Sequence, residues 1–356
     1  MYAMNDNIHQ IDLPKRIVIG NNILQKIVDH IRELGLGKRS IIVSGYGATR
    51  NYANMVKEYL VDSGLECWNI VIDRASMSEV AKVGSISKEV NAEILIGVGG
   101  GKAIDVAKYV ASNNCMKFVS VPTTPSHDGI ASPFASIRDL SKPISTRAAT
   151  PVLVVADIDI ISKAPRRNII AGCCDLIGKF SAVLDWRLAH RLRGEYYGEY
   201  AASLALLSAK HIVKYSELFT SRDIPPEAIR VLVEALISSG IAMAIAGSTR
   251  PASGSEHLIA HAIDVIANYP ALHGEEVGIG SIVALYLHGR NWRRIRDILK
   301  LIGAPTKARE IGISKEQFIK ALTIAHTIRP ERYTILGENG ISSEAAERIT
   351  QLLELY

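Results

Sequence analysis

Three histidines in the stretch "GSEHLIAHAIDVIANYPALHGEEVG" have the residue type and spacing of a metal site. His257 and His261 are four residues apart, which puts both side chains on one face of a helix, and His273 follows a Tyr-Pro break. Neutral imidazole is a good zinc ligand, and a carboxylate commonly completes a catalytic site that keeps one position open. Spacing alone therefore favours His257 and His261 as the metal pair. "HLIAH" has the spacing of a metalloprotease motif, but Leu258 replaces the general-base glutamate, which disfavours protease chemistry.

A glycine-rich loop follows an apolar strand pattern in "IGVGGGKAIDVAKYVA". Gly99, Gly100 and Gly101 allow the backbone to approach a ligand closely and to adopt positive φ. The helix that opens after them offers free N–H groups and a positive dipole end to phosphate, which suits the pyrophosphate of a dinucleotide. The loop is neither GxGxxG nor Walker A, because Ala103 follows Lys102 where Mg²⁺ binding needs Ser or Thr. A plain strand–helix turn is the alternative.

A second turn, "VPTTPSHDGIASP", places small hydroxyl residues at the end of another strand pattern. Such residues cap helices and also bind cofactors through hydrogen bonds. By its local context, Asp128 before a glycine is an ordinary turn residue. The hydroxyl residues are Thr123, Thr124, Ser126 and Ser132.

Composition excludes several classes of protein. Of the 356 residues 48% are hydrophobic, enough for a sizeable core. Against 36 acidic residues there are 41 basic ones, and the net charge of +5 is too weak and too scattered to indicate nucleic-acid binding. No secretory signal and no apolar run of transmembrane length is visible, so we expect a cytoplasmic protein without membrane insertion.

The cysteines indicate a reducing compartment. Cys67, Cys115, Cys173 and Cys174 form no CxxC pair, and adjacent cysteines make poor disulfide partners. Cys173 and Cys174 precede Asp175 within an apolar helical pattern. We therefore expect them to be buried and not to bind metal.

In the first half of the chain, short β-branched runs alternate with amphipathic helical patterns. Nearly all-apolar strands between helices predict a parallel sheet covered on both faces. A polar segment at 132–151 interrupts the alternation and predicts a surface hairpin around "LSK". The strand patterns are 16–20, 40–45, 67–73, 93–100, 117–124 and 151–157, and the helical patterns lie near 21–35, 50–63, 78–91 and 102–113.

The character of the sequence changes after Pro165. Ala, Leu and Ile recur at helical spacing, and strand patterns vanish. We predict an α/β Rossmann-like dinucleotide-binding domain at 1–165 and an all-helical metal- and substrate-binding domain at 166–356. A cleft between them is the expected ligand site.

Several motifs together resemble one family, the glycerol-1-phosphate dehydrogenases, which are related to glycerol dehydrogenase, the iron-containing alcohol dehydrogenases and dehydroquinate synthase. The resemblance spans essentially the whole chain, and "SHDGIASP" is its most discriminating part. It implies a dehydroquinate synthase-like fold and reduction of dihydroxyacetone phosphate by NADH or NADPH to sn-glycerol 1-phosphate, the backbone precursor of archaeal membrane phospholipids. The motifs are "GGGKAIDVAK", "VPTTPSHDGIASPFASI", "CCDLIGK", "SGSEHLIAH", "LHGEEVGIG" and "RPERYTIL".

The resemblance also implies roles for individual residues. Asp175, His257 and His273 would bind one metal ion per subunit, Zn²⁺ rather than Fe²⁺. Asp175 would also contact the substrate, as would Asp128 and His261, and either of the last two is a candidate for proton delivery. The residues implied to bind the cofactor are Gly99, Gly100, Gly101, Lys102, Ala103, Thr123, Thr124, Ser126 and Ser132.

The sequence is compatible with more than one cofactor and with more than one site for the substrate phosphate. "SIIVSGYGATR" has no acidic residue that would bind the adenosine ribose and exclude NADP, and it ends in Arg50, so we expect both cofactors to be used. Arg329 and Arg332 are candidates for the substrate phosphate, with solvation of a surface loop as the alternative. Lys142 and Arg147 are weaker candidates.

Three other functions compete with this one. A glycerol or polyol dehydrogenase of the same fold would prefer an unphosphorylated substrate. Dehydroquinate synthase would need more basic residues in the loop that reads "SHDGIASP". A non-catalytic nucleotide-binding protein would hold no metal. We also expect a homo-oligomer.

Overall fold

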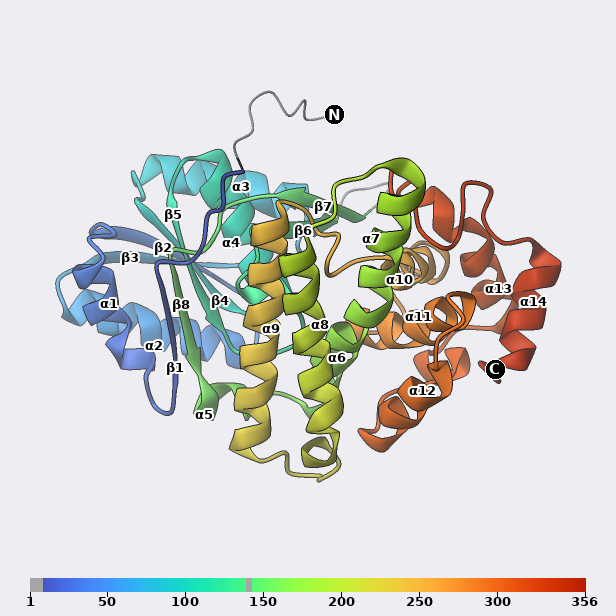
Figure 1. Cartoon of the computed structure of the whole chain (residues 1–356). Helices are drawn as coiled ribbons and strands as arrows, with labels where there is room; N and C mark the ends of the chain where they lie inside the picture. Colours follow the sequence, from blue (N-terminus) through green and yellow to red (C-terminus); the bar gives the residue numbers. More distant parts are fainter. Residues whose placement is uncertain (1–8, 139–142) are drawn as a thin grey trace.

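The structure, a computed structural model, describes residues 9–138 and 143–356. Its centre is a six-stranded sheet in the order β1-β8-β5-β4-β2-β3, in which all neighbouring strands are parallel (Figure 1). The strands are β1 (Arg16–Gly20), β2 (Arg39–Ser44), β3 (Glu66–Val71), β4 (Ile94–Gly99), β5 (Lys117–Pro122) and β8 (Leu153–Asp157).

Helices cover both faces of this sheet because successive side chains of its strands point to opposite sides. In β2, Ile41 and Val43 pack in the core cluster with α3 and α4, whereas Ile42 packs with α1 and α2. All four helices follow the predicted amphipathic stretches. They are α1 (Ile27–Glu33), preceded by the 3-10 turn Leu24–Lys26, α2 (Ala48–Asp62), α3 (Met77–Glu89) and α4 (Gly101–Asn113).

The predicted hairpin is also confirmed. β6 (Phe134–Arg138) and β7 (Pro143–Arg147) pair antiparallel outside the main sheet. A short 3-10 turn, Asp128–Ile130, connects β5 to this hairpin.

The remainder of the chain, on the right of Figure 1, is helical as predicted. From residue 166 to the end every regular element is a helix, and breaks fall near the expected prolines, as at Pro226, which starts α9. The helices are α5 (Ile158–Ile161), α6 (Arg166–Ile177), α7 (Lys179–Arg193), α8 (Glu199–Lys214), α9 (Pro226–Ala246), α10 (Ser255–Ala267), α11 (His273–Leu287), α12 (Trp292–Leu301), α13 (Lys315–Ile324) and α14 (Ser343–Leu352), with 3-10 turns at Ser216–Phe219, Ala308–Ile311 and Ala325–Thr327.

Helix α9 is long and apolar enough to cross a membrane by length and composition alone. In the structure 67% of its most apolar window is buried inside the protein, and Figure 1 shows it packed beside α8. Burial of this extent is that of a core helix, whose apolar surface is covered by its neighbours.

The predicted fold class is confirmed, and the boundary at residue 165 stays a prediction. The main core cluster is continuous across that boundary, because Ile130 and Ile161 belong to the same cluster as Ile169 and Cys173.

Candidate functional site

A cleft of about 610 Å³ lies at the carboxyl ends of β2, β3 and β4 and extends to the helical half. The loops after β2 and β4 leave these neighbouring strands in opposite directions along the sheet, since β2 leads to β3 and β4 leads to β5. Such a switch in strand order opens the crevice where α/β sheets bind ligands. The cleft is lined by Gly45 and Lys102 on the sheet side and by Asp175, His257 and His273 on the helical side.

Each glycine of the "GGG" loop is required by contacts within the protein. Gly99 has a φ of +152°, a conformation in which other residues are strained, and a side chain there would meet Thr49. A Cβ on Gly100 would lie 2.8 Å from Thr124 Oγ1, and one on Gly101 would collide with the ring of His127. Gly100 and Gly101 therefore make room for the second turn, which covers the first residues of α4, whereas Gly99 makes room for Thr49 of α2.

Two groups of side chains within the described ranges have metal-ligand geometry. Asp175, His257 and His273 form one, and His261, Asp264 and His273 form the other; within each group the ligand atoms lie within 4.8 Å of one another. Neither group contains both His257 and His261, the two histidines that the four-residue spacing favoured as the metal pair. The His257 and His261 ring centroids are 6.4 Å apart, whereas each ring centroid is 5.1 Å from that of His273.

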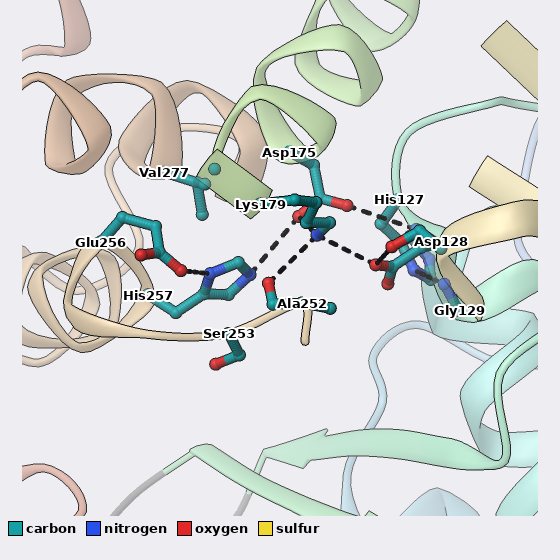
Figure 2. Close-up of polar contacts among 12 residues, drawn as sticks. His127, Asp128, Gly129, Asp175, Lys179, Ala252, Ser253, Glu256, His257 and Val277 are labelled. Atoms are coloured by element: carbon teal, nitrogen blue, oxygen red, sulfur yellow. Dashed lines mark hydrogen bonds and ion pairs between the residues drawn. The ribbon is translucent and has the colours of Figure 1, made fainter. Parts of the chain in front are cut away.

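The first group has the better-supported donor atoms (Figure 2). His257 Nδ1 lies 2.7 Å from Glu256 Oε1, and this hydrogen bond leaves Nε2 facing Asp175, whose Oδ1 is 3.4 Å away. A carboxylate behind a histidine fixes its orientation and makes it a stronger ligand. Glu256 is itself held, because Ser181 Oγ and the Gly254 N–H donate to it. His261 has no such support: its Nδ1 is 3.6 Å from Asp264, too far for a hydrogen bond.

The turn between α10 and α11 brings His273 to the group. Asn268 and Tyr269 both have positive φ, which reverses the chain between the helices. His273 is the first residue of α11, and Glu275 caps that end by accepting the Leu272 N–H at 3.0 Å. Arg167 on α6 donates two hydrogen bonds of 2.6 Å to Glu275, so α6 and α11 are joined beside the candidate metal ligands.

Glycines allow the helices that carry these ligands to pack closely. A Cβ on Gly274 would collide with the Ala171 carbonyl of α6, and one on Gly172 would collide with the Pro125 carbonyl of the second turn. The α6 helix thus contacts both α11 and the second turn, and Asp175 lies one turn further along it.

Gly274→Ala should separate α11 from α6 and displace His273. We expect a loss of stability of about 1–3 kcal/mol, typical of overpacking, together with a lower metal content. Thermal unfolding and metal analysis of the purified variant would measure both. Gly278→Ala on the same helix is the matched control, because its nearest contact would be 3.3 Å, to Cys174. Equal effects of the two substitutions would contradict this explanation.

A buried lysine links the metal group to the second turn. Lys179 Nζ lies 2.9 Å from Asp128 Oδ2 and 3.2 Å from Asp175 Oδ1, and it donates to the Ala252 carbonyl at 3.2 Å (Figure 2). Its side chain is fully buried. Asp128 also accepts a hydrogen bond of 2.7 Å from Ser239, so both carboxylates are fixed in position.

Burial and neighbouring charges shift the pKa values of Lys179, Asp175 and the histidines around them. Burial alone would lower the pKa of Lys179, but Asp128 and Asp175 raise it above its ordinary value. Burial would raise the pKa of Asp175, but Lys179 and His257 bring it well below its ordinary value. Burial and neighbouring positive charge push the pKa values of His261 and His273 far down, so both imidazoles are neutral.

Most residues predicted for the site lie at the cleft. Those that line it are Gly100, Gly101, Lys102, Ala103, Thr124, Ser126, Asp128, Ser132, Asp175, His257, His261 and His273. Gly99 and Thr123 do not line it; the Thr123 N–H donates to the Gly99 carbonyl at 3.0 Å. Ser132 is buried, and its hydroxyl also bonds to the backbone of Phe134.

Sequence reasoning assigned no role to Lys179, Glu256 or Asp73. Lys179 stands four residues after Asp175, a spacing that could have indicated the pair. Glu256 precedes His257 directly and resembles an ordinary acidic residue of a first helical turn. Asp73 follows β3 rather than β2, where an acidic residue was sought, and it lines the cleft.

The other predictions for single residues have mixed outcomes. Cys173 and Cys174 are buried and free, as expected, and burial raises the pKa of both thiols. Arg147 is exposed and lies 3.7 Å from Asp12 rather than at the cleft. Lys142 lies outside the described residues.

Known proteins resemble this chain in sequence and in structure. A profile of the iron-containing alcohol dehydrogenases matches residues 18–165. A protein of Saccharolobus islandicus named glycerol-1-phosphate dehydrogenase [NAD(P)+] is 53% identical over 353 residues, covering 99% of both chains. One of the same name from Aeropyrum pernix is 51% identical over 349 residues, covering 98% of this chain and 99% of the relative.

Solved structures at lower identity share the fold. A probable glycerol dehydrogenase from Sinorhizobium meliloti 1021 has a TM-score of 0.79 at 22% identity, with 97% of this chain and 98% of the other covered. A sulfoacetaldehyde reductase from Bifidobacterium kashiwanohense, solved with NAD+, has a TM-score of 0.74 at 18% identity, with coverage of 97% and 98%.

Proposed function

The chain belongs to the glycerol-1-phosphate dehydrogenases, among the iron-containing alcohol dehydrogenases, and we propose that it reduces dihydroxyacetone phosphate to sn-glycerol 1-phosphate with NADH or NADPH. It is accordingly an oxidoreductase that acts on a CH–OH group. The convergence of Asp175, His257 and His273 at a cleft that also contains the glycine-rich loop carries the proposal. The product would supply the backbone of archaeal membrane phospholipids, and the enzyme would work as a cytoplasmic homo-oligomer with separate cofactor and metal domains meeting near residue 165.

The donor set fits one divalent cation. Ligands of a tetrahedral ion with bonds of about 2.1 Å lie about 3.4 Å apart, and the three donor atoms are already within 4.8 Å of one another. Two imidazoles and one carboxylate leave an open position, as in catalytic zinc sites, so we favour Zn²⁺ over Fe²⁺. When bound, the ion would supply Lewis acidity at the carbonyl that is reduced.

The chain's own residues would bind and orient the reactants. The N–H groups in the first turn of α4, from Gly101 to Ala103, would bind the cofactor pyrophosphate, while Gly99 and Gly100 shape the loop before them. Thr124, Ser126 and Ser132 would flank the nicotinamide, which carries the hydride, while Thr123, which does not line the cleft, joins the two turns through its N–H bond to Gly99. Lys102 Nζ donates to the Asp73 carbonyl at 3.3 Å and so joins this loop to the end of β3.

Two groups remain as candidates to relay a proton from water to the product oxygen. Asp128 is fixed by Lys179 and Ser239, which would hold its carboxylate against the substrate. His261 is neutral and lines the cleft next to His273. Asp175 would touch the substrate from its position among the metal ligands.

A chiral product assay with dihydroxyacetone phosphate and each reduced cofactor tests the proposal. We expect sn-glycerol 1-phosphate, and we expect metal analysis to find one zinc ion per chain. Formation of sn-glycerol 3-phosphate would overturn the assignment. A higher kcat/KM for unphosphorylated glycerol or dihydroxyacetone would instead favour a polyol dehydrogenase.

Cofactor preference gives a further prediction. Asp73 lines the cleft two residues after the end of β3, and its carboxylate lies 3.2 Å from Arg74. A carboxylate there would accept hydrogen bonds from the adenosine ribose hydroxyls of NADH and would repel the 2′-phosphate of NADPH. Arg74 would instead attract that phosphate. We expect wild-type enzyme to use both cofactors and Asp73→Asn to raise the preference for NADPH about tenfold, the effect of one nearby charge. Arg74→Gln should move it the other way in the same comparison of kcat/KM, and an unchanged ratio in both variants would refute this role.

A further inference from the structure

The two arginines of "IRPERYTIL" lie in one anchored segment but have different partners. Arg332 donates to the Ser253 carbonyl and, at 2.6 Å, to Thr249 Oγ1. It therefore holds the loop that precedes α10, and both of its terminal nitrogens donate to protein groups. The same loop is held from the other side by Lys179, which bonds to Ala252.

Arg329 has no such partner. Among the described residues none forms a hydrogen bond or ion pair with its guanidinium, although the side chain is partly buried and lines the cleft. Burial lowers the pKa of Arg329, and only Glu331 opposes this. Burying a guanidinium without a hydrogen-bond partner costs free energy. An anion bound in the cleft would offset that cost through charge-assisted hydrogen bonds.

The position of Arg329 is fixed by its neighbours. Pro330 restricts its backbone, and further along the segment the Ile335 N–H donates to Asp185 at 2.7 Å while the Tyr333 carbonyl accepts from Arg250 at 2.9 Å. A cation on an anchored segment loses little conformational freedom when it binds a ligand.

Arg329 lines the same cleft as His261, Thr249 and Ser253. Its charge, like that of Arg332, contributes to the low pKa of His261, which agrees with this proximity. Two carboxylates are also near. Asp264 lines the cleft at 3.6 Å from His261, and Glu331 is exposed to solvent.

We propose that Arg329 forms the subsite for the phosphate group of the substrate, while Arg332 acts only by holding the loop at 249–253. This rests on the proposed function, because it places the phosphate of a phosphorylated triose at Arg329 and the carbonyl at the metal group. A planar guanidinium binds phosphate through two parallel hydrogen bonds, and Thr249 and Ser253 line the same cleft. Arg329 would then distinguish phosphorylated from unphosphorylated substrates.

The test compares Arg329→Gln and Arg329→Lys with wild type and with Arg348→Gln, an exposed arginine on α14. We expect Arg329→Gln to lower kcat/KM for dihydroxyacetone phosphate by about 10- to 100-fold, mainly through KM, with zinc content retained. For dihydroxyacetone, which lacks the phosphate, the decrease should be far smaller. Arg329→Lys should recover part of the loss, and Arg348→Gln should behave as wild type.

Inorganic phosphate supplies a second measurement. It should inhibit dihydroxyacetone reduction competitively in wild type and much more weakly in Arg329→Gln. An equal loss with both substrates, or unchanged inhibition by phosphate, would overturn the subsite. If wild type fails to reduce dihydroxyacetone phosphate, the proposed function is wrong. The phosphate subsite can still be tested then, by comparing how strongly inorganic phosphate inhibits wild type and Arg329→Gln with any alcohol or ketone that the enzyme turns over.

Discussion

His257→Ala should abolish zinc binding and lower kcat by roughly 10³-fold, because a Lewis acid at the carbonyl supplies several kcal/mol of transition-state stabilisation and each 1.36 kcal/mol is tenfold in rate. His257 is the ligand whose orientation is best defined, since Glu256 holds its Nδ1 and leaves Nε2 facing Asp175. Metal analysis after dialysis and steady-state kinetics would measure the two effects.

His261→Ala is the control that separates the two possible metal groups. His273 belongs to both groups and cannot discriminate between them, whereas His257 and His261 each belong to one. We expect His261→Ala to retain zinc and to lose turnover through its substrate contact. Lost metal in His261→Ala with retained metal in His257→Ala would assign the ion to His261, Asp264 and His273 instead.

Sequence patterns were sufficient to predict the sheet and its helices because these follow from local periodicity. The run at 94–99 is apolar and buried throughout, as a strand covered on both faces must be, and the hairpin of β6 and β7 stands apart from the main sheet. The strand order was not predicted. It places β4 between β5 and β2 and thereby positions the glycine loop at the switch point.

The metal group shows where local patterns are insufficient. Four-residue spacing predicts that two side chains share a helical face, but it contains no information on what approaches that face. Here His273 arrives from the next helix and Asp175 from α6, and close packing at Gly274 and Gly172 makes both approaches possible. Only the resemblance to a family pointed to Asp175, since its neighbours on α6 are apolar and buried.

Lys179→Met should destabilise the metal-free protein by about 3–5 kcal/mol, because it leaves the buried Asp175 and the largely buried Asp128 without their shared cation. Asp128 and Asp175 lie 2.9 and 3.2 Å from Lys179 Nζ, and the lysine is fully buried. Urea unfolding of metal-free protein, with m-values compared to confirm two-state behaviour, would measure the change.

Zinc should rescue this variant more than it stabilises wild type. The ammonium of Lys179 lies 3.2 Å from Asp175 Oδ1, so in wild type it would compete with the metal for a ligand oxygen and would repel the ion. In the variant that lacks this ammonium, bound zinc would balance the negative charge of Asp175. Because zinc binds the native state and not the unfolded chain, its binding free energy would add to the free energy of unfolding. We therefore expect a larger zinc-induced shift in Lys179→Met than in wild type, while kcat stays low because Asp128 has lost its anchor. A smaller shift would mean that Lys179 helps to build the metal site instead of competing with the ion.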